Sequence, residues 1–176
     1  MNKTNIINRA KKTLLTEVKE LKNLSKIFNN NFYKAVILLS KVKGRVIVTG
    51  VGKSAHIGNK ISATLASTGT PSYFVHATEA SHGDLGSIKK EDCVIAISNS
   101  GETAELQNIL NHTKRFSIPL AAISSKPQST LMQTADFSLT LPDAPEACAI
   151  GMAPTTSTTL TLALGDALAV ALMHKR

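Results

Sequence analysis

The stretch RVIVTGVGKSAHIG, residues 45–58, decides the fold class of this chain. It opens with a short β-branched run, which is typical of a parallel strand that is buried on both faces. Gly50 and Gly52 then form a tight turn, and residues 53–67 have the composition of a helix. A buried strand, a glycine turn and a helix in this order predict an α/β fold with a parallel sheet.

The same alternation continues along the chain on both sides of this stretch. Four more strands are predicted, over residues 72–75, 93–97, 120–123 and 137–141. Helices are predicted over residues 4–28, 32–43, 102–115, 127–134 and 155–174, and a polar loop over residues 76–92. We therefore expect a doubly wound five-stranded parallel sheet flanked by helices and preceded by two N-terminal helices. Residues 1–44 would pack on the core or on a neighbouring subunit, and residues 45–176 would form one domain.

The composition excludes several protein classes. Apolar residues make up 43% of the 176 residues, which is enough for a packed core. The two cysteines, Cys93 and Cys148, lie far apart in the sequence and suggest no disulfide framework, which fits a reducing cytoplasm. We find no signal peptide, and the longest apolar stretch, residues 160–173, is expected to be too short for a bilayer. The chain is predicted to be cytoplasmic, with no membrane partner.

The net charge of +8 is unevenly distributed. Residues 1–45 hold 11 of the 20 Lys and Arg but only two acidic residues, and the remainder of the chain is close to neutral. Basic side chains on predicted helices are most often a solvated face, so we predict no nucleic-acid partner.

Two nucleotide-binding motifs could be assigned to the first loop, but each is excluded because one required residue is missing. The GxGxxA pattern of residues 50–55 satisfies a loose dinucleotide fingerprint, which expects a carboxylate near the end of the second strand. His76 stands there instead. A nucleotide P-loop would need a glycine at position 47, which is Ile47.

Two interpretations of the same loop remain. In the first, the glycine turn and Ser54 bind one phosphate group at the N-terminus of a helix. In the second, the loop is only a tight turn that leaves Lys53 facing the solvent.

The loop after the third strand favours phosphate binding. The sequence ISNSGETAEL, residues 97–106, places the hydroxyls of Ser98, Ser100 and Thr103 around Gly101 at the start of a helix. Glycine permits a close approach of the backbone, and the helix dipole favours an anion there. Simple N-terminal capping is the alternative, but three hydroxyls exceed what a cap requires. The loop therefore predicts a site for a phosphate monoester.

Five motifs occur together and in order: GxGKS, STGTPS, EASHGDLG, ISNSGET and EACAIGMAPTTSTT. With them the chain closely resembles the sugar isomerase (SIS) domain of bacterial arabinose 5-phosphate isomerases, over about residues 10–174. The resemblance implies a parallel sheet of flavodoxin-like strand order and a homotetramer. It also implies interconversion of D-ribulose 5-phosphate and D-arabinose 5-phosphate, whose product feeds synthesis of the lipopolysaccharide sugar 3-deoxy-D-manno-octulosonate.

Isomerisation of this kind needs a base that removes a proton next to a carbonyl and so forms an ene-diolate. By resemblance, Lys53, Glu105 and Glu146 match the catalytic positions of the family. Glu146 is our choice for the base, and Lys53 can stabilise the charge of the ene-diolate. The resemblance further implies substrate contacts by Gly69, Thr70 and His82, which add to the phosphate contacts predicted above for Ser54, Ser98, Ser100 and Thr103.

No cofactor is expected to be required. His76 matches a family position that is able to hold zinc, but a catalytic metal site normally has three protein ligands. Zinc bound at His76 would therefore be adventitious or inhibitory.

The chain departs from the family after its last predicted helix. The family usually continues into a His-Pro-Gly-Gly segment that supplies another active-site histidine, and then into paired CBS modules. This sequence stops at Arg176, so the catalytic set is expected to be incomplete. Two alternatives stay open: a non-catalytic domain that senses a sugar phosphate, and an isomerase of hexulose 6-phosphates.

Overall fold

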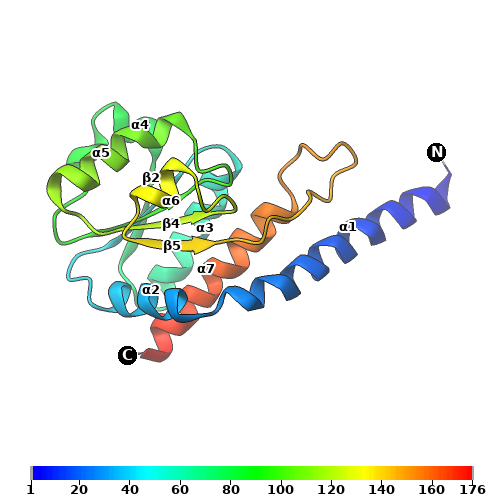
Figure 1. The fold of residues 1–176 in the computed structure, drawn as a ribbon, viewed down its shortest axis with the longest axis horizontal. Coiled ribbons are helices and arrows are strands. Elements are labelled where there is room, and N and C mark those ends of the chain that lie inside the picture. Colours follow the sequence, from blue (N-terminus) through cyan, green and yellow to red (C-terminus); the bar gives the residue numbers. More distant parts are fainter. Residues whose placement is uncertain (1, 176) are drawn as a thin grey trace.

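The computed structural model describes residues 2–175 and contains one five-stranded parallel sheet (Figure 1). The strand order is β2-β1-β3-β4-β5, which confirms the predicted doubly wound fold and its flavodoxin-like order. The strands are β1 (Val46–Gly50), β2 (Ser72–His76), β3 (Cys93–Ile97), β4 (Leu120–Ser124) and β5 (Phe137–Thr140).

Helices cover both faces of the sheet (Figure 1). One face carries α2 (Asn30–Ser40), α3 (Lys53–Ser67) and α7 (Thr156–Lys175), and α1 (Lys3–Leu24) packs against α7. The other face carries α4 (Ala77–Ser81), α5 (Gln107–Phe116) and α6 (Thr130–Thr134). Short 3₁₀ helices are η1 (Ser25–Ile27), η2 (Asp84–Ser87) and η3 (Ala104–Leu106).

Alternation along the strands explains the two layers. In β1, Val46 and Val48 belong to the core under α3 and α7, whereas Ile47 belongs to the core under α5. Successive side chains of a strand point to opposite faces, so a strand with apolar residues at every position needs cover on both sides. The β-branched run that opens the domain therefore specifies a sandwiched strand.

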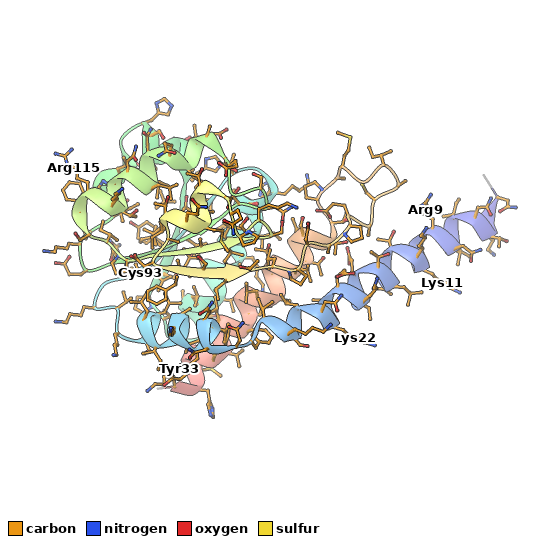
Figure 2. The ribbon with its side chains drawn as sticks, viewed as in Figure 1. Arg9, Lys11, Lys22, Tyr33, Cys93 and Arg115 are labelled. Carbon is orange, nitrogen blue, oxygen red and sulfur yellow. The ribbon has the colours of Figure 1, made fainter. Side chains whose placement is uncertain are left out.

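The N-terminal half of α1 extends beyond the rest of the domain (Figure 1). Apolar residues along the whole helix, Ile7, Leu14 and Val18 among them, are exposed. Figure 2 shows Arg9, Lys11 and Lys22 projecting from the same helix, which carries much of the basic excess. The helix contacts the body of the domain mainly through its C-terminal half, where Glu20 and Leu24 are buried.

The structure corrects three details of the prediction. Residues 76–92 were expected to be a loop but contain α4 and η2, because the His76 side chain caps α4 and the small alanines of α4 pack into the core. The helix predicted over residues 32–43 runs from Asn30 to Ser40, since the Asn29 side chain caps it. The helix predicted over residues 102–115 begins as η3.

The last helix also differs from expectation. The apolar stretch of residues 160–173 was expected to be too short for a bilayer, but α7 has 20 residues and is the one helix within residues 2–175 that is long and apolar enough. Half of the apolar window of α7 is buried inside the domain. In addition, the carboxylate of Asp166 on α7 forms an ion pair with the ammonium group of Lys60 on α3 at 2.5 Å. We therefore describe α7 as a core helix.

Candidate functional site

The carboxyl ends of β1 and β3 lie side by side and support the first two parts of the site. A Cβ atom at Gly50 would lie 3.2 Å from the Ile97 carbonyl oxygen, so the loop needs glycine for this close approach. Gly52, the N-cap residue directly before α3, has φ 58° and ψ −129°, a conformation that residues with a side chain avoid. This turn places Lys53 and Ser54 in the first turn of α3.

A small cavity of about 170 Å³ lies beside this turn. It is bounded by α3, by the loop after β3 and by the start of α7. Its lining residues are Val51, Lys53, Ser54, Ile57, Asn99, Pro154, Ser157, Thr158 and Thr161. We call this cavity the central pocket. It combines one ammonium group with several hydroxyls, which suits a polar anionic ligand.

The three hydroxyls that were predicted to gather after β3 do so. Ser98 Oγ lies 2.7 Å from Thr103 Oγ1 and 3.4 Å from Ser100 Oγ. The backbone N–H of Gly101 donates to Ser98 Oγ at 2.9 Å. These hydroxyl–hydroxyl contacts go beyond an N-terminal cap, and we call this group the hydroxyl cluster. It adjoins the central pocket through Asn99, which lies between the two serines and lines the pocket.

Backbone N–H groups at the start of α6 donate hydrogen bonds to the loop that carries the hydroxyl cluster. The backbone N–H of Leu131 donates to the Gly101 carbonyl at 3.1 Å, and the N–H of Thr130 donates to Oε1 of Glu102 at 2.7 Å. These hydrogen bonds from Thr130 hold the pKa of Glu102 below its ordinary value. Gly101 has φ 70°, and a Cβ atom there would clash with Ser129 Oγ. The positive φ of Gly101 and the close approach of the Ser129 side chain therefore both require glycine at the centre of the cluster.

Glu146 lies in the loop before α7, and its carboxylate accepts hydrogen bonds from the start of that helix. Oε2 accepts from the backbone N–H groups of Thr155 at 2.7 Å and Ser157 at 3.3 Å, and from the Thr155 hydroxyl at 3.1 Å. Oε1 accepts from the hydroxyl of Ser157, which lines the central pocket. Glu146 is not itself a lining residue of the central pocket, but its hydrogen bond with Ser157 connects it to the pocket that Lys53 lines.

The same hydrogen bonds set the charge of Glu146. Partial burial acts to raise the pKa of this carboxyl group, but the donors from Ser157 and Thr155 outweigh it. The net result is a pKa below the ordinary value of 4.5, so Glu146 is ionised at neutral pH. An ionised carboxylate next to a pocket can accept a proton.

Glu105 and His82 lie outside the central pocket. Glu105 is exposed on η3, directly behind the hydroxyl cluster, and His82 is exposed at the end of α4. Their elements are neighbours, because α4 packs against η3. The structure therefore does not bring either residue into the lining of the pocket that holds Lys53.

Gly69 and Thr70 are not brought to this site within one chain. They precede β2 and so lie at the amino edge of the sheet, whereas the hydroxyl cluster lies at the carboxyl edge. They line a separate small pocket with Gly44 and Val46. The expectation that they contact the same substrate has no support from the geometry of a single chain, because parallel strands keep their two edges apart.

His76 ends β2 opposite Gly50. Its Nδ1 accepts a hydrogen bond from the backbone N–H of Thr78 at 3.3 Å, which leaves Nε2 as the other ring nitrogen. Within residues 2–175, no three His, Cys, Asp or Glu side chains gather as a metal site. The residues around His76 therefore do not fit a metal centre held by this chain.

The two cysteines have opposite environments. Burial, with Asp136 and Asp92 nearby, raises the pKa of Cys93 to about 12, so this residue is an inert member of the core. Burial also acts to raise the pKa of Cys148, but backbone N–H groups, those of Ala153 and Met152 among them, lower it overall.

Comparison with known proteins places this geometry in a family. The sequence pattern of the SIS domain matches residues 38–171. The chain belongs to the SIS domain family.

This SIS domain has curated relatives of about twice its length. It is 50% identical over 170 residues to the arabinose 5-phosphate isomerase KdsD of Pseudomonas aeruginosa, covering 97% of this chain and 52% of the relative. It is 49% identical over 172 residues to the arabinose 5-phosphate isomerase KpsF of Escherichia coli O6:H1, covering 97% of this chain and 53% of the relative. The chain spans about half the length of the curated relatives it matches.

Several solved structures share the fold. The SIS domain superposes on a protein of E. coli CFT073 in complex with arabinose 5-phosphate with a TM-score of 0.95 at 42% identity, covering 99% of this chain and 93% of that one. A putative sugar-phosphate isomerase from Listeria monocytogenes gives a TM-score of 0.95 at 28% identity, with 99% and 92% coverage. The Vibrio vulnificus NanR protein complexed with ManNAc-6P gives 0.80 at 18% identity, covering 93% of this chain and 61% of that one, which shows the fold alone.

Sequence reasoning missed several residues of this SIS domain that the structure places at the site. Asn99, Ser157, Thr158 and Thr161 line the central pocket, and Glu102 ties the hydroxyl cluster to α6. Two signals could have found them. Asn99 stands between the two serines of the third loop, and the run TTSTT, residues 155–159, places hydroxyls at the start of the last helix.

Proposed function

We propose that this SIS domain is an aldose–ketose isomerase that interconverts D-ribulose 5-phosphate and D-arabinose 5-phosphate. The observation that carries the proposal is that Lys53, Ser54 and Ser157 line one pocket and that Ser157 is hydrogen-bonded to the carboxylate of Glu146. A cation in a pocket, with an ionised carboxylate one hydrogen bond away and a cluster of hydroxyls next to it, matches the needs of proton transfer on a sugar phosphate.

The phosphate of the substrate would bind at the hydroxyl cluster. Ser98, Ser100 and Thr103 provide neutral donors, and Ser54 provides another from the first turn of α3. Hydrogen bonds between an ionised phosphate and neutral hydroxyls are charge-assisted and hold the ligand without a counter-ion. This leaves the cation of the pocket free for the reacting end of the sugar.

The reaction proposed here moves protons only. Glu146 takes a proton from C1 of the ketose, the C1–C2 enediolate forms, and the proton returns to C2 as the aldehyde forms at C1. One hydroxyl proton passes between O1 and O2 in the same step, so atoms balance without an oxidant or reductant. On this chemistry the enzyme requires no cofactor.

Lys53 would stabilise the negative charge of the enediolate from the pocket that it lines. A point cation is worth most where charge develops in the transition state, away from bulk water. Glu105 and His82 would act from outside the lining of the central pocket, with Glu105 as the second acid–base candidate and His82 as a substrate contact.

The pentose substrate is supported by similarity. The relatives at about 50% identity carry the name arabinose 5-phosphate isomerase, and a structural neighbour at 42% identity was solved in complex with arabinose 5-phosphate. We infer from these names that the product feeds synthesis of 3-deoxy-D-manno-octulosonate for lipopolysaccharide in the cytoplasm.

We also propose that the protein is a homotetramer. The exposed apolar side chains of α1, including Leu14 at 61% exposure and Leu15 at 66%, support packing of this helix against another copy. The hydroxyl of Thr13 on the same helix donates to the Ala147 carbonyl at 3.4 Å, next to Glu146. Assembly through α1 would therefore stabilise the conformation of the loop that contains Glu146, the proposed base.

The proposal is tested by assaying isomerisation of both pentose phosphates, and of hexulose 6-phosphates, with the purified chain. Glu146→Gln should reduce kcat by about 10²- to 10⁴-fold, because it removes a general base, while sugar-phosphate affinity survives. Lys53→Ala should also reduce kcat and should weaken affinity to a smaller degree.

The matched control is Glu17→Gln, which removes an acidic residue of α1 that is not among the lining residues of the central pocket. Turnover of hexulose 6-phosphates alone would replace the pentose assignment. Tight sugar-phosphate binding with no turnover of any substrate, both by this chain and by a form extended to the length of the relatives, would make the protein a sensor and overturn the enzyme proposal.

A further inference from the structure

The two carboxylate oxygens of Glu146 have unequal surroundings. Oε2 accepts two backbone N–H groups and the Thr155 hydroxyl, so its acceptor capacity is used by the start of α7. Oε1 accepts only from the Ser157 hydroxyl among the residues that the structure describes. A carboxylate oxygen has two lone-pair positions, which leaves one position of Oε1 open.

Ser157 connects this oxygen with the central pocket. The residue lies in the first turn of α7, 8% exposed, and lines the pocket with Lys53 and Ser54. Its backbone N–H donates to Oε2 and its hydroxyl donates to Oε1, so one residue contacts both oxygens of the carboxylate. This bidentate contact fixes the rotation of the carboxyl group.

We infer that Ser157 is a positioning residue for the reaction, whose hydroxyl orients Oε1 of Glu146 next to the central pocket as the oxygen that takes the substrate proton. The inference rests on the proposed function, in which Glu146 is the base. A base that is misplaced by as little as about 1 Å loses much of its effect, so a group that fixes its rotation affects turnover more than binding.

The hydroxyl also favours the ionised carboxylate, because a donor stabilises the charged form of its acceptor. Loss of the Ser157 hydroxyl should therefore raise the pKa of Glu146 from its lowered value toward the ordinary one. Other charged groups on the surrounding elements stay in place in such a variant. They are Lys53 on α3, Glu17 on α1, and Asp143, which pairs with Lys126 at 2.9 Å; the titratable thiol of Cys148 lies in the same loop as Glu146.

The first measurement is the titration of Glu146 itself. The full chain is labelled with ¹³C-glutamate, and the carboxyl carbon of Glu146 is assigned by its loss in Glu146→Gln. In Ser157→Ala its titration midpoint should rise by about one pH unit or more. Thr159→Val is the matched control, because Thr159 is on the same helix turn but does not line the pocket. It should leave the midpoint unchanged.

The second measurement is kinetic. Ser157→Ala should lower kcat by about ten- to a hundredfold with little change in KM, since one hydrogen bond to a charged group is lost. The acid limb of the kcat/KM profile should move to higher pH, because a base with a raised pKa is protonated at higher pH. Ser157→Thr restores a hydroxyl and should recover both values, and Ser157→Cys, a weaker donor of similar size, should fall between.

The outcomes separate this inference from the proposed function. If the wild-type chain isomerises pentose phosphates and Ser157→Ala and Ser157→Cys match its kcat and its Glu146 midpoint, the inference is overturned and the proposed function stands. If the wild-type chain and the extended form both show no isomerisation, the proposed function fails and the inference fails as a statement about the reaction. A shift of the Glu146 titration midpoint in Ser157→Ala would then still establish that the Ser157 hydroxyl is hydrogen-bonded to Glu146.

Discussion

The backbone N–H of Thr130 donates a hydrogen bond to Oε1 of Glu102 at 2.7 Å, which ties α6 to the loop after β3. Glu102 is the residue that follows Gly101 at the centre of the hydroxyl cluster. Its carboxylate thus serves as an N-terminal cap for a different helix, across 28 residues of sequence. We conclude that the shape of the predicted phosphate site is maintained by a contact outside it.

Replacement of Glu102 should therefore weaken phosphate binding from a distance. Glu102→Ala should raise the dissociation constant of arabinose 5-phosphate by about two- to tenfold, since the loop loses one tie to α6. Glu102→Gln keeps a carbonyl acceptor and should have a smaller effect. Isothermal calorimetry measures both variants. Equal affinity of Glu102→Ala and wild type would show that the hydrogen bond between Glu102 and Thr130 does not contribute to ligand binding.

Ser100 tests the hydroxyl cluster directly. Ser100→Ala should raise the dissociation constant of the sugar phosphate by about ten- to a hundredfold, because it removes one hydrogen bond to a charged group. Ser67→Ala is the matched control, since that serine is exposed on α3 and its hydroxyl bonds within its own helix. If calorimetry finds the two variants alike, the phosphate assignment is refuted.

Alanine variants of Gly101 and Gly52 separate two causes of lost stability, namely backbone strain and steric overlap with a neighbouring side chain. Both have positive φ, but a Cβ atom at Gly52 would meet nothing within 4 Å, whereas one at Gly101 would clash with Ser129 Oγ. Gly52→Ala should destabilise the fold by about 1–3 kcal/mol through backbone strain alone. Gly101→Ala adds overpacking and should cost about 3 kcal/mol or more.

Urea unfolding measures both glycine variants. Adding Ser129→Gly to Gly101→Ala should recover part of the loss, because it removes the side chain that a new Cβ atom would strike. A double variant no more stable than Gly101→Ala alone would assign the whole effect to strain.

The lowered pKa of Glu146 predicts how stability depends on pH. A carboxyl group with a pKa depressed in the folded state stabilises the fold above its unfolded pKa, near 4.5 here, and this contribution is lost as the pH falls through the folded value. The difference in unfolding free energy between wild type and Glu146→Gln should therefore be largest at neutral pH and shrink below about pH 4.5. Urea titrations at several pH values measure it, and a difference independent of pH would contradict the assigned hydrogen bonds.

The exposed face of α1 predicts self-association. Light scattering at micromolar concentration should give a mass above that of one chain, and Leu14→Glu should reduce it, because a charge there would be buried in the interface. Lys12→Glu is the control, since it changes the charge of the same helix at another exposed position. A monomeric wild-type chain would remove the basis for a tetramer.

The local sequence determined the layers of the fold and the position of the phosphate loop. A run such as Val46–Val48 is apolar on both faces, and only a sheet covered on both sides buries it. The hydroxyls of Ser98, Ser100 and Thr103 are close in sequence, so a turn around Gly101 is enough to gather them. Short-range sterics and the period of the side chains determine such features.

Only the tertiary structure decided how distant segments meet. Ser157, the hydrogen-bond partner of Glu146, lies far along the chain from Lys53, and the two serve one pocket because α7 packs against α3. The same long-range packing assigned the Ser157 hydroxyl to Glu146, and it left Gly69 at the amino edge of the sheet. Contacts between segments far apart in sequence depend on the closure of the whole sheet, which no local pattern encodes.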